Sequence, residues 1–374
     1  MKLSDVVNRI NGNVDRFTTD LEYYVGGEHF DSNELAVTRK GMLKENLNVL
    51  GFKFHFAFQK RDVLFMARNP HLRKAGMVMF DGLCSDATYI LRSKDENVLL
   101  QEYLALQLQS DHFWNYCESH KVGSVNFANN WTSIANYEFD LPSIKEQKVL
   151  AEKLWAAYKV KESYRQLLST TDEMLKAKFQ EMFGDGKGTT YSVKDLFDLQ
   201  MGKTPDRKNL QYWKDGTNKW YSIADMSKSD IYSGDTDEYI SDIAVNESGI
   251  KKVVKGTIFM SFKLTIGKVL IAAEDLYTNE AIMAFIPKQI EKIKLNQMWC
   301  FYCFKYKDWL EHAALAVKGK TLNKESIGNN TILLPPMELQ QQFADIATQA
   351  EATKASLRAS IEAIDRVIRS LINQ

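Results

Sequence analysis

Cysteines, long apolar runs and leader-like features are scarce in this sequence. Four cysteines in a chain of 374 residues are too few for a disulfide scaffold, so we expect a reducing, cytoplasmic location. No stretch approaches the ~18 consecutive apolar residues of a membrane-spanning helix. Residues 1–17 carry polar side chains where a signal peptide needs an apolar run. The sequence therefore predicts a protein that does not associate with membranes.

An excess of charge of either sign is also missing. The 48 lysines and arginines equal the 48 aspartates and glutamates, so the formal net charge is +0. Composition therefore gives no support for nucleic-acid binding, and a basic face must be local if the protein has one. Hydrophobic residues make up 45% of the chain and charged residues 26%, which excludes wholesale disorder. The length predicts two or three domains.

Complete enzyme motifs are lacking as well. Residues 314–321 loosely match a phosphate-binding loop, but no strand is expected before them and no helix after them. Cys300 and Cys303 form a lone CxxC without the second pair that a structural zinc site needs. The pair Pro335-Pro336 stands in Leu-Pro-Pro-Met instead of the Asn/Asp-Pro-Pro-Tyr/Phe motif of adenine methyltransferases. We therefore expect no catalytic residue, metal site or bound cofactor in this chain.

An internal repeat organises the sequence. Residues 139–147 recur as residues 332–340, with an offset of 193 positions. Each copy has an apolar strand-like end, a Leu-Pro pair and then apolar residues at alternating steps of four and three, which is the spacing of a coiled coil. We call this line of residues the seam, and we expect it to form the helix-pair and partner interface. Its members are Leu150, Leu154, Tyr164, Leu168 and Leu175 in the first copy and Phe343, Leu357, Ile361, Ile364 and Ile368 in the second.

Looser repeats precede each long helix. Short β-branched and aromatic runs broken by Gly, Asn and Asp predict strands and turns, and helices are expected over 97–118 and 296–317. We therefore predict an α+β fold with two similar mixed α/β globular domains separated by an antiparallel pair of long coiled-coil-like helices, arranged as a pseudo-two-fold internal repeat. The predicted boundaries are 1–142 and 184–335 for the globular domains, 143–183 for the central helix and 336–374 for the C-terminal helix.

Each seam is interrupted by a lysine. Lys161 and Lys354 are equivalent in the repeat and could be polar register markers. We favour positions at the edge of the helix pair, from which their ammonium groups reach water. Other apolar residues lie off the seam and are expected to be covered by a partner, namely Leu167, Met174, Phe179 and Ile372.

This layout resembles the specificity (S) subunit of type I restriction–modification enzymes over the whole chain. The resemblance is carried by the Leu-Pro-x-x-x-x-Gln helix starts at Leu141 and Leu334, by Met-Gly-Lys-Thr-Pro at 201–205 and by Lys-Gly-Lys-Thr at 318–321. It implies two target recognition domains, 1–142 and 184–335, each reading one half of a split, asymmetric DNA sequence. The helices would serve as the spacer and as the docking site for methyltransferase subunits.

The resemblance also implies the partners. The chain would be a non-catalytic subunit that binds double-stranded DNA and two adenine-N6 methyltransferase (M) subunits, with restriction/translocase (R) subunits joining through the methyltransferase core. S-adenosylmethionine, Mg²⁺ and ATP would belong to those partners. Two alternatives stay open: the specificity subunit of a methylation-only or phage-defence complex, and a coiled-coil scaffold that holds two protein-binding domains and never contacts DNA.

Three clusters of cations are candidate DNA contacts. The strongest is at 203–214, where Lys, Arg and Asn stand in a Gly/Pro loop beside aromatic residues, a combination suited to phosphate clamping and to bidentate readout of guanine or adenine. The alternative for each cluster is a solvated surface with its aromatic residues in the core. The candidates are Lys203, Thr204, Arg207, Lys208, Asn209, Tyr212, Lys318, Lys320, Lys263, Arg68, Arg73, Lys74, Arg39, Lys121 and Asn126.

Overall fold

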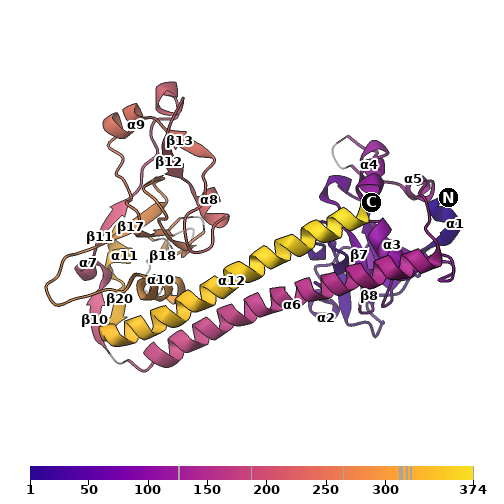
Figure 1. Ribbon diagram of the computed structural model, residues 1–374, viewed down its shortest axis with the longest axis horizontal. Helices are drawn as coiled ribbons and strands as arrows, with labels where there is room; N and C mark the ends of the chain where they lie inside the picture. Colours follow the sequence, from indigo (N-terminus) through magenta and orange to yellow (C-terminus); the bar gives the residue numbers. More distant parts are fainter. Residues whose placement is uncertain are drawn as a thin grey trace. The chain divides into compact units, whose positions relative to one another are not determined.

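The computed structural model describes residues 1–124, 127–186, 188–263, 265–310, 315–316, 319–320 and 322–373. The chain divides into two compact units (Figure 1). Unit 1 is Met1–Leu167 with Ser356–Gln374, and unit 2 is Leu168–Ala355. Within the described part of the chain, none of the helices has the length and apolarity required to cross a lipid bilayer.

The described residues of unit 1 form two sheets. The larger has the strand order β1-β9-β6-β7-β3, and only its edge strand β3 runs parallel to its neighbour; the smaller has the order β4-β2-β8-β5. The larger sheet comprises β1 (Val7–Ile10), β3 (Ala36–Val37), β6 (Val63–Met66), β7 (Ala75–Val78) and β9 (Thr88–Ser93), and the smaller comprises β2 (Tyr23–Val25), β4 (Gly41–Met42), β5 (Phe54–Phe58) and β8 (Gly82–Ser85). The short helices are α1 (Leu3–Val6), η1 (Gly27–His29), α2 (Leu43–Asn46), η2 (Pro70–Leu72), α3 (Gln101–Gln107), α4 (Asp111–Ser119) and α5 (Trp131–Ala135).

The core of unit 1 lies between the larger sheet and helices α3 and α4. Phe65 at the centre of the sheet is fully buried and stacks on Trp114 of α4, with ring centroids 5.7 Å apart. The single helix predicted over 97–118 is wrong, because the chain breaks between α3 and α4. Ser110 has extended backbone angles there, and its hydroxyl caps α4 by accepting from the amide of Phe113 at 3.1 Å.

The described residues of unit 2 repeat this plan. Its larger sheet has the order β11-β17-β14-β15, its smaller sheet the order β13-β12-β16, and β10 pairs with β20. The strands are β10 (Thr189–Ser192), β11 (Phe197–Met201), β12 (Asn218–Tyr221), β13 (Glu238–Ile240), β14 (Ile258–Ser261), β15 (Val269–Ile271), β16 (Tyr277–Thr278), β17 (Ile282–Pro287), β18 (Leu315–Ala316), β19 (Gly319–Lys320) and β20 (Thr331–Leu334). The short helices are α7 (Val193–Leu196), η3 (Leu210–Tyr212), α8 (Ile223–Ser227), α9 (Asp242–Glu247), α10 (Gln297–Tyr306) and α11 (Lys324–Asn329).

The repeat found in the sequence extends to strand pairing. The first four strands of the larger sheet in unit 1 correspond in order and antiparallel direction to the four strands of unit 2. In each smaller sheet the second strand pairs in parallel with a strand much later in the chain, at Tyr24↔Leu83 in unit 1 and Trp220↔Tyr277 in unit 2. The mixed α/β fold class and the internal repeat are confirmed. The helix expected over 296–317 ends earlier, at Tyr306, where Lys307 turns extended.

Two long helices, α6 (Ile144–Phe183) and α12 (Met337–Ile372), each contribute residues to both units. The two helices run antiparallel in unit 2, since Asp172 pairs with Lys354 while Phe179, further along α6, contacts Phe343 near the start of α12. Of the predicted seam, the structure buries Leu154, Leu175, Phe343 and Ile368 and leaves the others half-buried. Those half-buried residues are Leu150, Tyr164, Leu168, Leu357, Ile361 and Ile364.

The glutamine of each Leu-Pro-x-x-x-x-Gln motif anchors the start of its helix. Gln147 is fully buried, donates to the carbonyls of Pro142 and Val98 at 2.9 Å each, and accepts from the amide of Leu100. Gln340 repeats the arrangement in unit 2 with the carbonyls of Pro335 and Lys294 and the amide of Asn296. The motif therefore ties the first turn of each long helix to the segment directly before a short helix of the same unit, which is α3 in unit 1 and α10 in unit 2.

Candidate nucleic-acid interface

The loop over 202–217 carries the strongest cation cluster of the sequence. It connects β11 to β12, and its first residues are tied to the ends of neighbouring strands: the Gly202 amide donates to the carbonyl of Ile282, and the Lys203 amide donates to that of Thr278. A Cβ at Gly202 would lie 2.2 Å from the carbonyl oxygen of Asn279, so only glycine fits there. The loop therefore leaves the sheet edge in a defined direction.

The first two candidates in this loop bind other parts of unit 2. The Lys203 ammonium group donates to the carbonyl of Ser248. The Thr204 hydroxyl donates to the carboxylate of Glu280, and this hydrogen bond lowers the pKa of Glu280. Both side chains hold the loop in place, and a phosphate contact from Lys203 would require the ammonium group to share or leave its carbonyl.

Arg207 is the most constrained cation of the loop. Its guanidinium group binds the carboxylate of Glu238 through both terminal nitrogens, with Nη2 to Oε2 at 2.9 Å. It also lies over the rings of Trp213 and Trp220, at 3.8 Å and 4.7 Å from their centroids. The hydrogen bond to Glu238 raises the pKa of Arg207. The geometry makes Arg207 the organising residue of the loop.

The remaining candidates of the loop differ in exposure. Asn209 caps η3 by accepting from the Gln211 amide at 3.1 Å. The Tyr212 hydroxyl donates to Glu247 at 3.1 Å, and that hydrogen bond raises the pKa of Tyr212. Lys208 is exposed, and its ammonium group has no ion pair within the described part of the chain. Among the candidates of this loop, Lys208 is the cation that the structure leaves available to a phosphate.

The cations over 68–74 in unit 1 are also mostly engaged. Arg73 pairs with Asp111, and the Lys74 ammonium group donates to the carbonyl of Gly27 at 2.7 Å. Arg68 is exposed, without a side-chain partner among the described residues. The cluster therefore offers one outward cation.

The other candidates of unit 1 pair with nearby carboxylates. Arg39 binds Asp31 at 2.7 Å, and both side chains are about half exposed. Lys121 binds Glu118 at 2.7 Å and lies 4.5 Å from the ring centroid of Phe127. Surface pairs of this kind contribute little to stability, so both cations can exchange their carboxylate for another anion.

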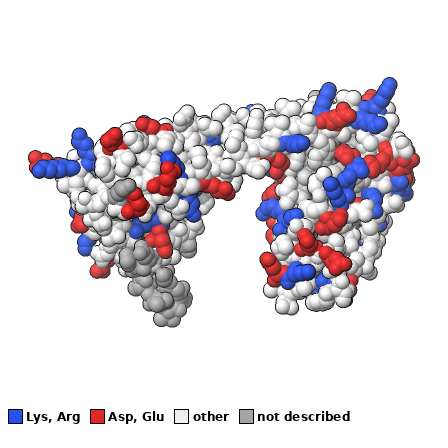
Figure 2. Space-filling view, turned by 90° about the horizontal axis from the view of Figure 1, so that it is seen from below, with Lys and Arg blue, Asp and Glu red and all other residues white. Residues whose placement is uncertain are grey.

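Lys263 of unit 2 is exposed, with its ammonium group 5.4 Å from the ring centroid of Phe262. Lys318 and Asn126 lie outside the described residues, as does the side chain of Lys320. On the face that Figure 2 shows, blue and red side chains are interspersed over the described atoms of both units. Among the described residues, the candidates gather within the loop over 202–217 and within the turn over 68–74. Lys263 also lies close enough to Glu280, the partner of Thr204, to lower the pKa of that carboxylate.

The expected position of the seam lysines at the edge of the helix pair is wrong. Lys161 is only 1% exposed, and its ammonium group binds Glu34 at 2.8 Å and Asp365 of α12 at 2.6 Å. Glu34 in turn binds Arg165 at 2.6 Å. Two carboxylates close to the ammonium group make burial possible where snorkelling to water was expected.

Lys354 forms the matching cluster in unit 2. It is 3% exposed and binds Asp172 of α6 at 2.7 Å and Glu351 at 2.8 Å. Burial alone lowers the pKa of Lys354, but the hydrogen bonds to these carboxylates outweigh it and raise the pKa. Asp172 and Asp365 are themselves 193 positions apart, as are the two lysines. Each long helix thus gives a lysine to one cluster and an aspartate to the other.

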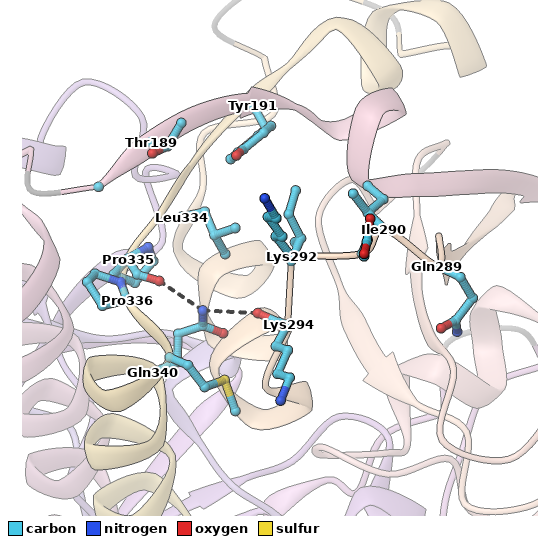
Figure 3. A pocket seen from close by; sticks show the side chains of 14 residues that line it. Thr189, Tyr191, Gln289, Ile290, Lys292, Lys294, Leu334, Pro335, Pro336 and Gln340 are labelled. Atoms are coloured by element: carbon cyan, nitrogen blue, oxygen red, sulfur yellow. Dashed lines mark hydrogen bonds between the residues drawn. The ribbon is translucent and has the colours of Figure 1, made fainter.

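A cavity of about 650 Å³ lies beside the start of α12 in unit 2. Figure 3 shows Gln340 bridging the carbonyls of Pro335 and Lys294 at its edge, with Lys292 and Tyr191 also lining it. Its walls combine apolar side chains with surface lysines, and it holds no grouping of nucleophile and base. No cluster of three or more metal-ligating side chains occurs among the residues described.

The CxxC cysteines are core residues. Burial raises the pKa of Cys300, and it raises that of Cys303 to about 12. Both thiols therefore stay protonated near neutral pH, which excludes them as thiolate nucleophiles.

Comparisons with known proteins give the family. A family model described as the type I restriction modification DNA specificity domain matches residues 1–168 and again residues 187–366. The specificity subunit of the type I restriction enzyme MjaIX from Methanocaldococcus jannaschii is 26% identical over 183 residues, which is 48% of this chain and 41% of that protein. The match therefore spans less than half the length of that relative.

Solved structures share the fold over the full chain. The S subunit of a type I restriction–modification system from M. genitalium is 10% identical, with a TM-score of 0.58 and coverage of 100% of this chain and 94% of the other. A chain from a study of complex assembly and conformational transition of the type I R-M system is 17% identical, with a TM-score of 0.56 and coverage of 100% and 95%. At these identities the likeness concerns the fold.

The twofold family match and the repeated topology confirm the predicted resemblance to type I restriction–modification specificity proteins. The chain belongs to the family of type I restriction–modification DNA specificity domains.

Proposed function

We propose that this chain is the subunit that selects the DNA sequence in a type I restriction–modification complex. The globular part of each unit reads one half of a split, asymmetric site, with 1–142 and 184–335 as the two target recognition domains. The observation that carries the proposal is the repeat: the DNA specificity domain matches twice, and four strands of the larger sheet follow the same order in both copies. Two similar readers in one chain fit a site with two separate halves.

The two half-sites should differ in sequence. The connection from β1 to β2 in unit 1 spans residues 11–22, and the corresponding connection from β11 to β12 in unit 2 spans residues 202–217. The side chains of the two loops differ. Base readout depends on a few such side chains, whereas phosphate contacts set position and affinity. An asymmetric site follows from this difference.

The long helices offer a surface for methyltransferase subunits. Met174 of α6 and Val367 of α12 are 193 positions apart and are 47% and 52% exposed. Leu167 is 46% exposed. Equivalent exposed apolar residues in both repeats fit two M subunits, one per repeat.

Two of the residues expected under a partner are part of the cores instead. Phe179 packs against Phe183 and Phe343 in unit 2, and Ile372 packs against the core of unit 1. The exposed apolar residues that remain for docking are Leu167 and Val367 in unit 1 and Met174 in unit 2.

Catalysis belongs to the partners in this proposal. M subunits bind S-adenosylmethionine, and R subunits, which join through the methyltransferase core, use Mg²⁺ and ATP. This chain binds none of these cofactors; its contribution is the choice of sequence and the distance between its two halves.

Single-molecule sequencing of DNA tests the proposal. Cells would co-express this chain with the methyltransferase encoded beside it, and the control strain would lack only this chain. The expected result is a split motif methylated at adenine on both strands in the first strain alone. Absence of a new motif, with both proteins soluble and associated, would favour a coiled-coil scaffold with two protein-binding domains, and a filter-binding measurement on random duplex DNA at low salt would check that reading.

A further inference from the structure

The most exposed apolar side chains of the molecule gather in a few loops. Among the described residues, four large apolar side chains are more than 60% exposed: Phe17 at 63%, Val49 at 79%, Phe52 at 81% and Leu210 at 76%. Phe17, Val49 and Phe52 lie in loops of unit 1 and Leu210 begins η3 in unit 2, and none of the four lies on α6 or α12. Single exposed apolar residues are common on protein surfaces. These four side chains, however, are confined to one region of each unit.

Phe17 and Leu210 lie in corresponding connections of the two units. The strands that flank these connections are offset by 190 positions at the start (Val7 and Phe197) and by 195 at the end (Tyr23 and Asn218). Phe17 lies in the connection from β1 to β2, and Leu210 lies in the connection from β11 to β12. The two connections differ in length and in most side chains, yet each carries one large apolar residue pointing into solvent.

The loop of unit 1 holds Phe17 outward by specific contacts. The carboxylate of Asp15 accepts from the Phe17 amide at 3.0 Å, which closes a tight turn around the exposed ring. The guanidinium group of Arg16 lies 4.8 Å from the ring centroid and donates to the carbonyl of Leu50 at 2.8 Å. This bond joins the Phe17 turn to the neighbouring loop that carries Val49 and Phe52.

The loop of unit 2 holds Leu210 outward in a similar way. Leu210 begins η3, whose cap is Asn209, and its carbonyl accepts from the amide of Lys214 at 2.9 Å. The Trp213 ring that follows packs against Arg207 and against the Trp220 ring. Hydrogen bonds and ring contacts thus fix the backbone on both sides of Leu210, while its side chain is exposed to solvent. Contact with an external partner is the simplest explanation for a fixed, exposed apolar side chain.

We propose that Phe17 and Leu210 are base-contacting residues, each inserting an apolar side chain against the bases of its own half-site. The inference rests on the proposed DNA-recognition function. Apolar side chains of this kind contact the thymine methyl group or wedge between base steps. One to three side chains form too small a patch for a stable protein interface, whereas a base contact needs no larger area.

Alanine substitutions in the assembled complex with the methyltransferase test the proposal. Phe17→Ala and Leu210→Ala would be compared with Met79→Ala and Val254→Ala, which remove apolar side chains of similar exposure, 55% and 54%, elsewhere in the same units. Binding would be measured on the complete site and on two duplexes in which one half-site or the other is scrambled. The methylated motif would be sequenced for each variant.

Each substitution should affect one half-site. We expect Phe17→Ala to weaken binding to the complete site by about fivefold or more and to relax the methylated motif in one half, with Leu210→Ala acting on the other half. Both controls should stay within about twofold of the wild type. Unchanged affinity and motif, or equal changes in both halves, would overturn the inference. A wild-type chain that directs no split motif and does not distinguish the scrambled duplexes would instead refute the proposed function.

Discussion

At the scale of residues, the cations of the loop over 202–217 divide into two groups. Lys203 and Arg207 already hold a carbonyl and a carboxylate of unit 2, and Arg207 is also packed on two indole rings. Lys208 and Lys214 are exposed and have no ion pair within the described residues. A cation without a protein partner binds phosphate at the lower cost, because no existing contact is lost. The outward lysines are therefore the better phosphate contacts.

Lys208→Ala should weaken binding to any duplex, whatever its sequence. Loss of one phosphate contact should reduce the slope of log affinity against log salt concentration by about one. Fluorescence anisotropy titrations at several salt concentrations between about 50 and 200 mM would measure that slope, because binding through phosphate contacts weakens steeply over this range. Lys208→Arg keeps the charge and should keep the slope, and an unchanged slope in the alanine variant would remove Lys208 from the contact set.

His29 predicts a pH dependence for unit 1. Its Nδ1 accepts from the Gly26 amide at 2.9 Å, so the imidazole there is neutral. Burial lowers the pKa of His29 from its usual value of 6.5. The folded state therefore binds the proton less well than the unfolded state, and the stability that His29 contributes is present above pH 6.5 and lost as the pH falls below it.

The expected result is a free energy of unfolding that decreases as the pH falls below 6.5, the usual pKa of histidine. Urea unfolding at several pH values would measure it. His29→Gln removes the titrating group and should flatten that part of the profile. An identical profile in the wild type and in His29→Gln would show that other groups cause the pH dependence.

The types and positions of the site residues could be predicted from the sequence, but the side chains that bind them could not. It located the cation-rich loop at 203–214, whereas the carboxylates that engage it, Glu238 and Glu280, are 31 and 76 positions away from their partners. The same limit explains the error on Lys161. Its seam position was readable from the spacing, but Glu34 lies 127 positions away in the recognition domain. Side-chain partners distant in sequence leave no trace in local periodicity.

At the scale of elements, the long helices were the most predictable part of the molecule. A period of 3.5 residues sustained over many turns, with Leu-Pro before it and a glycine after it, marks a helix and its ends. The shorter helices were less so, since apolar residues continue through the α3–α4 break and Ser110 alone signals the new cap. The seam also contains two buried ionic clusters. In each cluster the lysine of one long helix is neutralised in part by an aspartate of the other.

Lys161→Met should lower the free energy of unfolding by about 3 kcal/mol. The substitution leaves the carboxylates of Glu34 and Asp365 without their shared cation. The loss stays at the low end of the range for broken buried pairs because Arg165 still binds Glu34 and Asp365 is 29% exposed. Chemical denaturation would measure it.

Two comparisons separate charge from packing at this site. Lys153→Met on the exposed face of α6 should change stability by less than about 0.5 kcal/mol. Adding Glu34→Gln and Asp365→Asn to Lys161→Met should recover most of the loss, because no uncompensated charge then remains buried. If the triple variant is as unstable as Lys161→Met alone, packing of the lysine stem rather than its charge holds this part of the helix pair.

At the scale of the whole molecule, the repeat determines what the chain can do. One offset of 193 positions relates the helix starts and the buried lysines and aspartates of the two long helices. Sequence comparison within the chain found this offset because the helix starts are nearly identical in pattern. The bases read by each domain leave no such pattern, since they depend on a few loop side chains and on the local shape of the DNA.

Lengthening both helices should change the distance between the half-sites without changing the bases read. Seven residues inserted after Leu167 in α6, and seven after Ala355 in α12, keep the heptad spacing and leave the lysine–aspartate cluster of each unit untouched. Seven helical residues add about 10 Å, which corresponds to about three base pairs of duplex at 3.4 Å each. Sequencing of methylated DNA should therefore return the same two half-sites with a spacer longer by about that number.

An insertion in α6 alone is the matched control. It displaces the first part of α6 from its α12 neighbours in one unit, so it should abolish methylation or destabilise the protein instead of lengthening the spacer. A paired insertion that keeps the original spacer would show that the helices do not determine it, and a paired insertion with altered half-sites would show that base choice is not confined to the recognition loops. Only an unchanged pair of half-sites at a new spacing fits helices that set distance while the two globular domains choose sequence.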